Sequence, residues 1–181
     1  MITIQDNFIE NSHYDELISL WIEFNMVHWI GAKTAPKNPL AQLVHRTYPR
    51  DSGVTGATAW YNIRPINPQW HNDIDSYCTQ NKILYYPKRN PDYTHLYYIH
   101  SPKSGGELEL ETGDLLIPKI NRMVGFPCKW HHRIRPYKGN RVSIGIIWWY
   151  DLPKIYGNLG SFDTTSIERV WEKEDKLNSI K

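Results

Sequence analysis

The feature that most constrains this sequence is a series of short apolar segments in its second half, separated by turn residues. Six of these segments are predicted to be strands, over residues 96–100, 106–110, 115–118, 122–127, 132–135 and 141–150. Glycine and polar residues mark the turns between them, as at Lys138-Gly139-Asn140. Short strands at such regular spacing predict an all-β sandwich or barrel.

The last of these segments, residues 141–150, is apolar on both faces. Its apolar side chains follow one another almost without interruption: Ile144, Ile146, Ile147, Trp148 and Trp149. A strand that is buried on both faces has a nearly continuous apolar sequence. We therefore expect this strand to lie at the centre of its sheet, with both faces covered.

An N-terminal helix is expected over residues 12–25, with Ser12 as its N-cap. Its apolar residues recur at helical spacing and form one stripe: Leu17, Ile18, Leu20, Trp21 and Phe24. Such a stripe packs a helix onto a sheet, so this helix is expected to cover one face of the strands. A second short helix is expected from residue 166 to about residue 176.

The remaining segments are less regular. Residues 31–56 contain several glycines and prolines without clear periodicity, and we expect irregular structure there. Residues 58–63 are predicted to be a further strand, which ends before the prolines at 65 and 68. Residues 74–95 are polar and rich in tyrosine, and so long a loop in a compact domain is often functional, for example as a lid.

The composition suits one domain with a substantial core. The chain has 181 residues, of which 40% are hydrophobic, and it contains 8 Trp and 12 Tyr. A domain of this size buries roughly two-thirds of the surface of its unfolded chain. We expect a single domain over residues 1–181, with a β core at about 58–152, a helical N-terminal support and a C-terminal tail over 153–181.

The charge and the N-terminus argue against several classes of partner. The net charge is +2 and the basic residues form no long run, so no nucleic-acid partner is expected. The first residues lack the regions of a signal peptide, and no apolar run approaches the roughly 18 residues that span a bilayer. We expect a cytoplasmic protein with no membrane partner, in which Cys78 and Cys128 are reduced thiols.

A candidate metal site begins at His71-Asn72-Asp73. On a strand, His71 and Asp73 point to the same face, so that an imidazole and a carboxylate lie side by side. Alone this pattern is weak, because it often occurs by chance in a surface turn. His131 and His132 offer a third ligand, and only one of them can face the site because neighbouring strand residues point in opposite directions. Two imidazoles and a carboxylate are the ligand set of a non-haem Fe(II) facial triad.

A candidate anion site follows at Arg141, nine residues after His132. The turn at 138–140 predicts a hairpin that would set His132 and Arg141 on one face of neighbouring strands. An arginine fork binds a carboxylate through two hydrogen bonds, and Ser143 could add a hydroxyl on the same face. A surface arginine is the alternative, although so apolar a strand argues against it.

Taken in order, these motifs resemble those of the Fe(II)- and 2-oxoglutarate-dependent oxygenases, in particular the prolyl 4-hydroxylase-like branch. That branch carries His-x-Asp, a strand with Gly-Gly-x-Leu, His-x-Val-x-Pro, and Arg-x-Ser followed by an aromatic residue. The corresponding segments here are His71-Asn72-Asp73, Gly105-Gly106-Glu107-Leu108, His132-Arg133-Ile134-Arg135-Pro136, and Arg141-Val142-Ser143 with Trp148-Trp149. Ile134 replaces the valine, and the resemblance covers about residues 58–152.

The resemblance implies a double-stranded β-helix, a cupin-like jelly roll with supporting helices. It implies that His71, Asp73 and His132 bind Fe(II), with 2-oxoglutarate and O2 as co-substrates and ascorbate as an optional reductant. Arg141 and Ser143 would then bind the far carboxylate of 2-oxoglutarate. The substrate would be a prolyl residue in a peptide or protein, or a free small molecule such as an amino acid.

Two tyrosines match co-substrate contacts of that family. Tyr61 lies ten residues before His71, on the strand that precedes the His-x-Asp motif, and Tyr98 is a second candidate. Core packing is the alternative for both, because buried tyrosine is common in sheets.

Two other classes of function compete with an oxygenase. One is a non-catalytic jelly-roll binding module that keeps a metal-like cluster for structure. Arg141 argues against it, because a structural metal does not need a dicarboxylate anchor. The other is a cupin-type enzyme that uses Zn or Mn, but cupins usually carry more histidines at the metal and lack this arginine.

Overall fold

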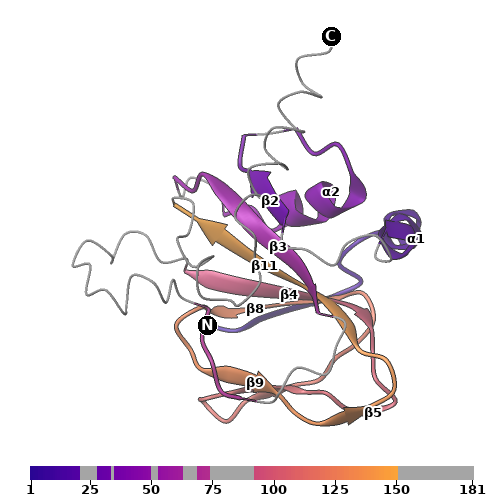
Figure 1. Ribbon diagram of the computed structural model, residues 1–181, viewed down its shortest axis with the longest axis vertical. Coiled ribbons are helices and arrows are strands. Elements are labelled where there is room, and N and C mark those ends of the chain that lie inside the picture. The colour runs from indigo at the N-terminus through magenta and orange to yellow at the C-terminus, as the bar shows by residue number, and fades with distance from the viewer. Residues whose placement is uncertain (21–27, 34, 50–52, 63–68, 74–91, 151–181) are drawn as a thin grey trace, which may run out of the picture.

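The computed structural model of the protein describes residues 1–20, 28–33, 35–49, 53–62, 69–73 and 92–150 (Figure 1). Its elements in chain order are β1 (Thr3–Asp6), α1 (Asn11–Leu20), β2 (His28–Gly31), α2 (Pro39–Arg46), β3 (Gly56–Asn62), β4 (Tyr93–His100), β5 (Ser104–Gly105), β6 (Leu108–Leu110), β7 (Leu115–Leu116), β8 (Arg122–Pro127), β9 (His132–Ile134), β10 (Tyr137–Lys138) and β11 (Val142–Trp149). Most of them are strands, as predicted.

The strands form one large sheet and two small ones. The large sheet has six strands in the order β1-β8-β4-β11-β3-β2, and each neighbouring pair is antiparallel. The small sheets have the orders β7-β6-β9 and β10-β5. Figure 1 shows α2 on one side of the large sheet and the small strands β5 and β9 on the other. This layered antiparallel arrangement confirms the predicted mainly-β jelly roll.

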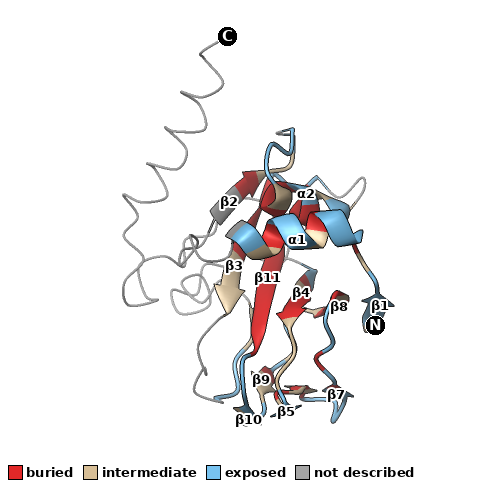
Figure 2. Ribbon diagram, turned by 90° about the vertical axis from the view of Figure 1, so that its right-hand side faces the viewer, coloured by how far each residue is buried: buried red, intermediate tan, exposed pale blue. Residues whose placement is uncertain are grey.

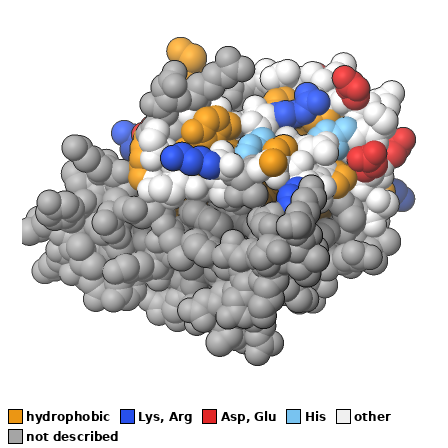
Figure 3. All heavy atoms as spheres, turned by 90° about the horizontal axis from the view of Figure 1, so that it is seen from above, with side chains coloured by type: hydrophobic (Ala, Val, Ile, Leu, Met, Phe, Trp, Pro, Cys, Tyr) orange, Lys and Arg blue, Asp and Glu red, His pale blue; other side chains and the backbone are white. Residues whose placement is uncertain are grey.

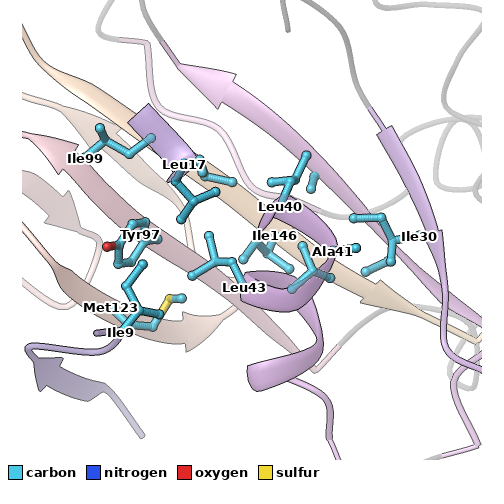
Figure 4. Packing of buried hydrophobic residues seen from close by; sticks show 14 of the residues in the cluster. Ile9, Leu17, Ile30, Leu40, Ala41, Leu43, Tyr97, Ile99, Met123 and Ile146 are labelled. Carbon is cyan, nitrogen blue, oxygen red and sulfur yellow. The ribbon is translucent and has the colours of Figure 1, made fainter. Parts of the chain in front are cut away.

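The helices and the large sheet enclose one hydrophobic core. Figure 4 shows Leu17 of α1 and Leu40 and Leu43 of α2 pointing toward the sheet, where they meet Tyr97 and Ile146. α2 presents four buried residues to the strands beneath it: Leu40, Ala41, Leu43 and Val44. We call this side of the large sheet its helix face.

A second core lies between the large sheet and the three-stranded sheet. The large sheet contributes Leu96, Tyr98, Val124 and Phe126, and the small sheet contributes Leu108, Leu110 and Leu116. We call this side of the large sheet its inner face. Residues two apart on a strand share a face, so Thr94, Leu96 and Tyr98 of β4 all belong to the inner face.

β11 is the central strand that the sequence predicted. It pairs with β3 on one side and β4 on the other, and all eight of its residues are buried. Figure 2 shows it as a continuous buried strand. Ile144, Ile146 and Trp148 belong to the helix-face core, so Ser143 and Gly145 point to the inner face.

Two local predictions were wrong, and two short strands were not predicted. α2 lies within residues 31–56, which we expected to be irregular. Its N-cap is Asn38, whose Oδ1 accepts a hydrogen bond of 2.8 Å from Ala41 N, and Pro39 follows at the first helical position. In α1, Tyr14 N donates to Glu10 O at 3.0 Å, so Glu10 rather than Ser12 occupies the cap position. β1 and β2 were not anticipated either, because both are four-residue strands at the sheet edges.

The predicted hairpin between His132 and Arg141 is also wrong. β9 pairs with β6, β10 pairs with β5, and β11 pairs with β3 and β4. The turn at 138–140 therefore carries the chain from the small sheets to the large one. A short turn signal is the same for a hairpin and for a crossing between sheets, so the sequence could not distinguish them.

Some predictions fall outside the described residues: most of the 74–95 segment, the helix at 166–176, the tail at 153–181 and Cys78. Within the described part of the chain, no helix is long and apolar enough to cross a membrane. Where described side chains reach the surface in Figure 3, hydrophobic, basic, acidic and histidine side chains are interspersed.

Candidate functional site

The backbone places His71 and His132 side by side. His71 N donates to His132 O at 3.0 Å, and His132 N donates to His71 O at 2.8 Å. This exchange of two hydrogen bonds makes the two residues an antiparallel pair whose side chains share a face. Their ring centroids lie 4.3 Å apart. A further bond, from Asp73 N to Cys128 O at 3.0 Å, fixes Asp73 on the same segment.

Asp73 completes a compact cluster with the two histidines. One ligand atom from each of His71, Asp73 and His132 lies within 4.8 Å of the others. His132 Nε2 is 3.5 Å from Asp73 Oδ2. His132 is buried, whereas His71 is exposed, so the cluster opens outward on one side.

Hydrogen bonds orient each member of the cluster. Nδ1 of His132 lies 3.1 Å from Trp130 O, and Nδ1 of His71 lies 3.1 Å from Gln69 O. A carbonyl oxygen only accepts, so each Nδ1 carries a hydrogen, and Nε2 is the ring nitrogen left for a metal. Thr94 Oγ1 donates to Asp73 Oδ2 at 2.8 Å. Such bonds hold metal ligands in place before a metal arrives.

Burial also favours the protonation state that a metal needs. It lowers the pKa of His132 below its ordinary value, and the nearby His71 acts in the same direction, although the Asp73 carboxylate opposes them. His132 is therefore neutral at neutral pH and can bind a metal through its lone pair. Two imidazole nitrogens and one carboxylate oxygen on one side of a space fit the facial triad of non-haem Fe(II).

His131 points away from this cluster. It is exposed, and its Nδ1 lies 3.0 Å from Glu111 Oε2, which also accepts a bond of 3.1 Å from His131 N. The structure therefore brings His132 together with His71 and Asp73 and leaves His131 on the outside, as strand alternation requires.

Arg141 forms a second buried polar group. Only 4% of the residue is exposed. Its Nε donates to Gly106 O at 3.1 Å, its Nη1 donates to Ser143 Oγ at 3.1 Å, and its Cζ lies 5.1 Å from the centroid of the Tyr98 ring. Among the described residues, no carboxylate forms an ion pair with it. A buried charge without a partner is unfavourable, so binding an anion would stabilise this guanidinium.

Two donors in this group lack partners. Within the described part of the chain, Arg141 Nη2 and Tyr98 OH are buried and make no hydrogen bond. Burial raises the pKa of Tyr98, opposed by the positive charge of Arg141, so the phenol keeps its proton at neutral pH. A carboxylate could accept from both donors, and it would neutralise the guanidinium.

The Gly105-Gly106 turn positions Arg141. Both glycines have positive φ angles, 72° and 78°, which other residues rarely adopt. A Cβ at Gly106 would lie 2.8 Å from Pro102 Cγ and 3.2 Å from Arg141 Cδ. This gives a physical role to the glycine pair in the sequence, because the turn aims the Gly106 carbonyl at Arg141 Nε.

The structure places Tyr61 outside this group. It lies opposite Ile144 in the β3–β11 register and packs against the helix-face core. Asn62 lies opposite Ser143 instead and therefore points to the inner face, as does Trp60. Sequence reasoning missed both residues, because the face of a β3 residue follows only from its register with β11. Tyr98 does lie opposite Ser143, on the inner face.

The metal-like cluster and the Arg141 group lie along the same face. Thr94, which holds Asp73, and Tyr98, which contacts Arg141, are four residues apart on β4 and both point inward. Phe126 lies opposite Thr94 in β8, and its ring packs edge-on against His132 with centroids 4.8 Å apart. A cation site and an anion site thus share the inner face of the large sheet.

No protein-family model and no curated protein matches this sequence, but solved structures do. A prolyl-4-hydroxylase from Pseudomonas putida matches with a TM-score of 0.57 and 14% identity, over 82% of this chain and 91% of the other. The viral collagen prolyl hydroxylase of Paramecium Bursaria Chlorella virus-1 matches with a TM-score of 0.56 and 14% identity, over 82% and 88%. A 2OG-Fe(II) oxygenase family protein from Burkholderia pseudomallei matches with a TM-score of 0.54 and 10% identity, over 83% and 84%. The chain has the fold of these proteins.

Proposed function

We propose that this chain is an Fe(II)- and 2-oxoglutarate-dependent dioxygenase that hydroxylates an unactivated C–H bond of a prolyl residue in a peptide or protein. The observation that carries the proposal is the buried guanidinium of Arg141, which has no acidic partner among the described residues and shares the inner face with the metal-like cluster. A structural metal alone would not need such an anchor.

His71, Asp73 and His132 are the residues that would hold the metal. Fe(II), together with 2-oxoglutarate and O2, supplies the oxidation that replaces a C–H hydrogen with a hydroxyl group. The backbone carbonyls of Gln69 and Trp130 keep the two imidazoles in the tautomer that exposes Nε2. With only these three protein ligands, a bound metal would keep positions open to substrates.

Arg141, Tyr98 and Ser143 are the residues that would bind the far carboxylate of 2-oxoglutarate. Arg141 Nη2 and Tyr98 OH are the two donors available to it. Ser143 Oγ accepts from Arg141 Nη1, so its own hydrogen can be donated to the same carboxylate. With one end held there, the 2-oxo acid end of the molecule would point along the inner face toward the cluster.

The prolyl substrate is supported by the relatives with this fold. Two of them are named as prolyl hydroxylases, one of them for collagen. This support comes from the fold. The experiment therefore compares peptides with free small molecules such as amino acids as substrates.

The test measures succinate formed from 2-oxoglutarate by the purified protein with Fe(II) and ascorbate. Proline-containing peptides and free amino acids, including proline, are added in parallel, and hydroxylated product is identified by mass. We expect succinate above background with at least one peptide. His132→Ala should abolish it, because the variant lacks a metal ligand.

His131→Ala is the matched control, since its side chain points outward to Glu111. This variant should keep most of the turnover. If the wild-type protein formed no succinate above background with any of these substrates, or if His131→Ala abolished turnover and His132→Ala did not, the proposal would be wrong. Hydroxylation of free amino acids alone would overturn only the choice of substrate.

A further inference from the structure

Trp60 lies flat against Gly145 on the inner face. A Cβ at Gly145 would lie 2.4 Å from Trp60 Cζ2, 2.5 Å from Cε2 and 2.8 Å from Cη2. These distances are too short for any side chain larger than hydrogen. The indole therefore packs on β11 at a glycine, because only glycine lacks the Cβ that would clash with the ring.

The orientation of this indole is fixed by a hydrogen bond. Trp60 Nε1 donates to Asn62 Oδ1 at 3.1 Å. Its polar atom is thereby satisfied within the chain, and its apolar ring is the part offered to a neighbour. Trp60 is half-buried, so part of it is accessible from outside.

The strand registers place Trp60 in a cross-strand row that lies between the rows of the two halves of the candidate site. Trp60 lies opposite Gly145, and Gly145 lies opposite Leu96. On one side is the row that contains Ser143 and Tyr98, which contact Arg141. On the other side is the row that contains Thr94, which holds Asp73. A molecule that reaches from Arg141 to the metal-like cluster must pass the row of Trp60.

We propose that Trp60, seated on Gly145, is the residue that determines which 2-oxo acid the protein accepts. The inference rests on the proposed function. The rigid indole limits the space beside the methylene carbons of the co-substrate. It therefore selects the five-carbon 2-oxoglutarate over a longer 2-oxo dicarboxylate, and apolar contact with those methylenes contributes to binding.

A second strand glycine that is crowded by side chains, on the opposite face of the sheet, supplies a control. At Gly125 of β8, a Cβ would lie 2.5 Å from Thr3 Oγ1 and 3.2 Å from His95 Cδ2. His95 lies opposite Ile146, which belongs to the helix-face core. Gly125→Ala thus introduces a comparable clash away from the inner face. A purely structural role for Trp60 would make Gly125→Ala and Gly145→Ala behave alike.

The experiment titrates 2-oxoglutarate and its one-carbon-longer homologue, 2-oxoadipate, into protein loaded with Mn(II), with the dissociation constants measured by calorimetry. We expect Gly145→Ala to weaken 2-oxoglutarate binding by roughly tenfold, because the methyl group forces the indole into the path of the co-substrate. Gly125→Ala should change that binding by less than about threefold.

Shortening Trp60 should relax the selection. In Trp60→Leu, the preference for 2-oxoglutarate over 2-oxoadipate should fall by roughly tenfold, the typical effect of one methylene in a fitted pocket. Trp60→Phe keeps a ring on Gly145 and should give an intermediate preference. Trp60→Phe also tests the selection of the 2-oxo acid if the leucine variant does not fold.

The inference is overturned if the wild-type protein binds 2-oxoglutarate while the Trp60 and Gly145 variants keep both its affinity and its preference. It is also overturned if Gly125→Ala weakens binding as much as Gly145→Ala. A wild-type protein that takes up Mn(II) but binds neither 2-oxo acid would instead show that the proposed function has failed.

Discussion

Arg141 shows most directly how single residues shape the candidate site. Its guanidinium is buried, two of its nitrogens are held by Gly106 O and Ser143 Oγ, and a third is left with no partner among the described residues. Arginine in this setting is preorganised, because its planar fork loses little freedom when a carboxylate arrives. Lysine would carry the same charge without the fork or the Nε bond.

Arg141→Lys should therefore weaken 2-oxoglutarate binding by roughly tenfold or more, as measured by calorimetry with Mn(II) present.

Tyr98→Phe removes one hydrogen bond to the co-substrate and keeps the ring, so 2-oxoglutarate affinity should fall by about fivefold, equivalent to about 1 kcal/mol. Arg133→Lys is the control, because Arg133 binds Glu109 outside this group. Equal effects at residues 133 and 141 would refute the assignment of the anchor.

Side-chain identity was more predictable than side-chain direction. The order of the motifs singled out His71, Asp73, His132, Arg141 and Ser143, and the structure gathers these residues in two neighbouring groups. Their roles as ligands remain predictions. The direction of the Tyr61 side chain did not follow from the sequence, because a shift of one position along a strand moves a side chain to the opposite face. The register that decides this comes from pairing with β11, more than 80 residues away in the chain.

Among the elements, the turn at Gly105-Gly106 links the small sheets to the anion site. Gly106→Ala should strain the backbone, because its φ is 78°, and should also push against Arg141 Cδ. Gly113 has a φ of 88°, but a Cβ there would meet nothing within 4 Å. Alanine at Gly113 should lower the free energy of unfolding by about 1 kcal/mol, the cost of left-handed backbone for a residue with a Cβ. Alanine at Gly106 should lower it further, because its Cβ would also lie 2.8 Å from Pro102 Cγ.

Only Gly106→Ala should weaken 2-oxoglutarate binding, since only this methyl group reaches Arg141. Urea unfolding and calorimetry on the two variants separate the two effects. Equal losses of binding in both variants would mean that the turn acts through general stability rather than through Arg141.

Long or strongly patterned elements were predicted well and short ones were not. β8 (Arg122–Pro127) and the buried β11 follow from their own residues. α2 has only eight residues, and its stability depends on the four side chains that it buries against the sheet. Such a helix leaves a local signal only at its cap, here Asn38-Pro39, which prediction by periodicity overlooks.

At the scale of the molecule, the two faces of the large sheet differ in the side chains that they carry. The helix face is packed with apolar side chains from α1 and α2, and the inner face carries the polar groups of the candidate site. His95 is an exception, because it is a titratable residue on the side away from the site. It lies opposite Gly125 and Ile146, and its Nδ1 makes no hydrogen bond with the described residues.

This placement predicts how stability depends on pH. Burial lowers the pKa of His95 to about 4, from 6.5 in the unfolded chain. The unfolded state therefore binds a proton that the folded state excludes, so the contribution of His95 is complete above pH 6.5 and is lost as the pH falls toward 4. The shift corresponds to about 3 kcal/mol of unfolding free energy at about 1.4 kcal/mol per pKa unit. Urea unfolding of the metal-free protein between pH 8 and pH 4 measures this loss.

His95→Phe fills the same space with a ring that does not titrate, so its stability should fall by about 3 kcal/mol less than that of the wild-type protein over this range. Some loss should remain in the variant, because burial also lowers the pKa of His132. The comparison of slopes is independent of how well phenylalanine packs, since a packing defect lowers stability equally at every pH. Parallel curves for the two proteins would show that His95 takes up its proton in the folded state as readily as in the unfolded one.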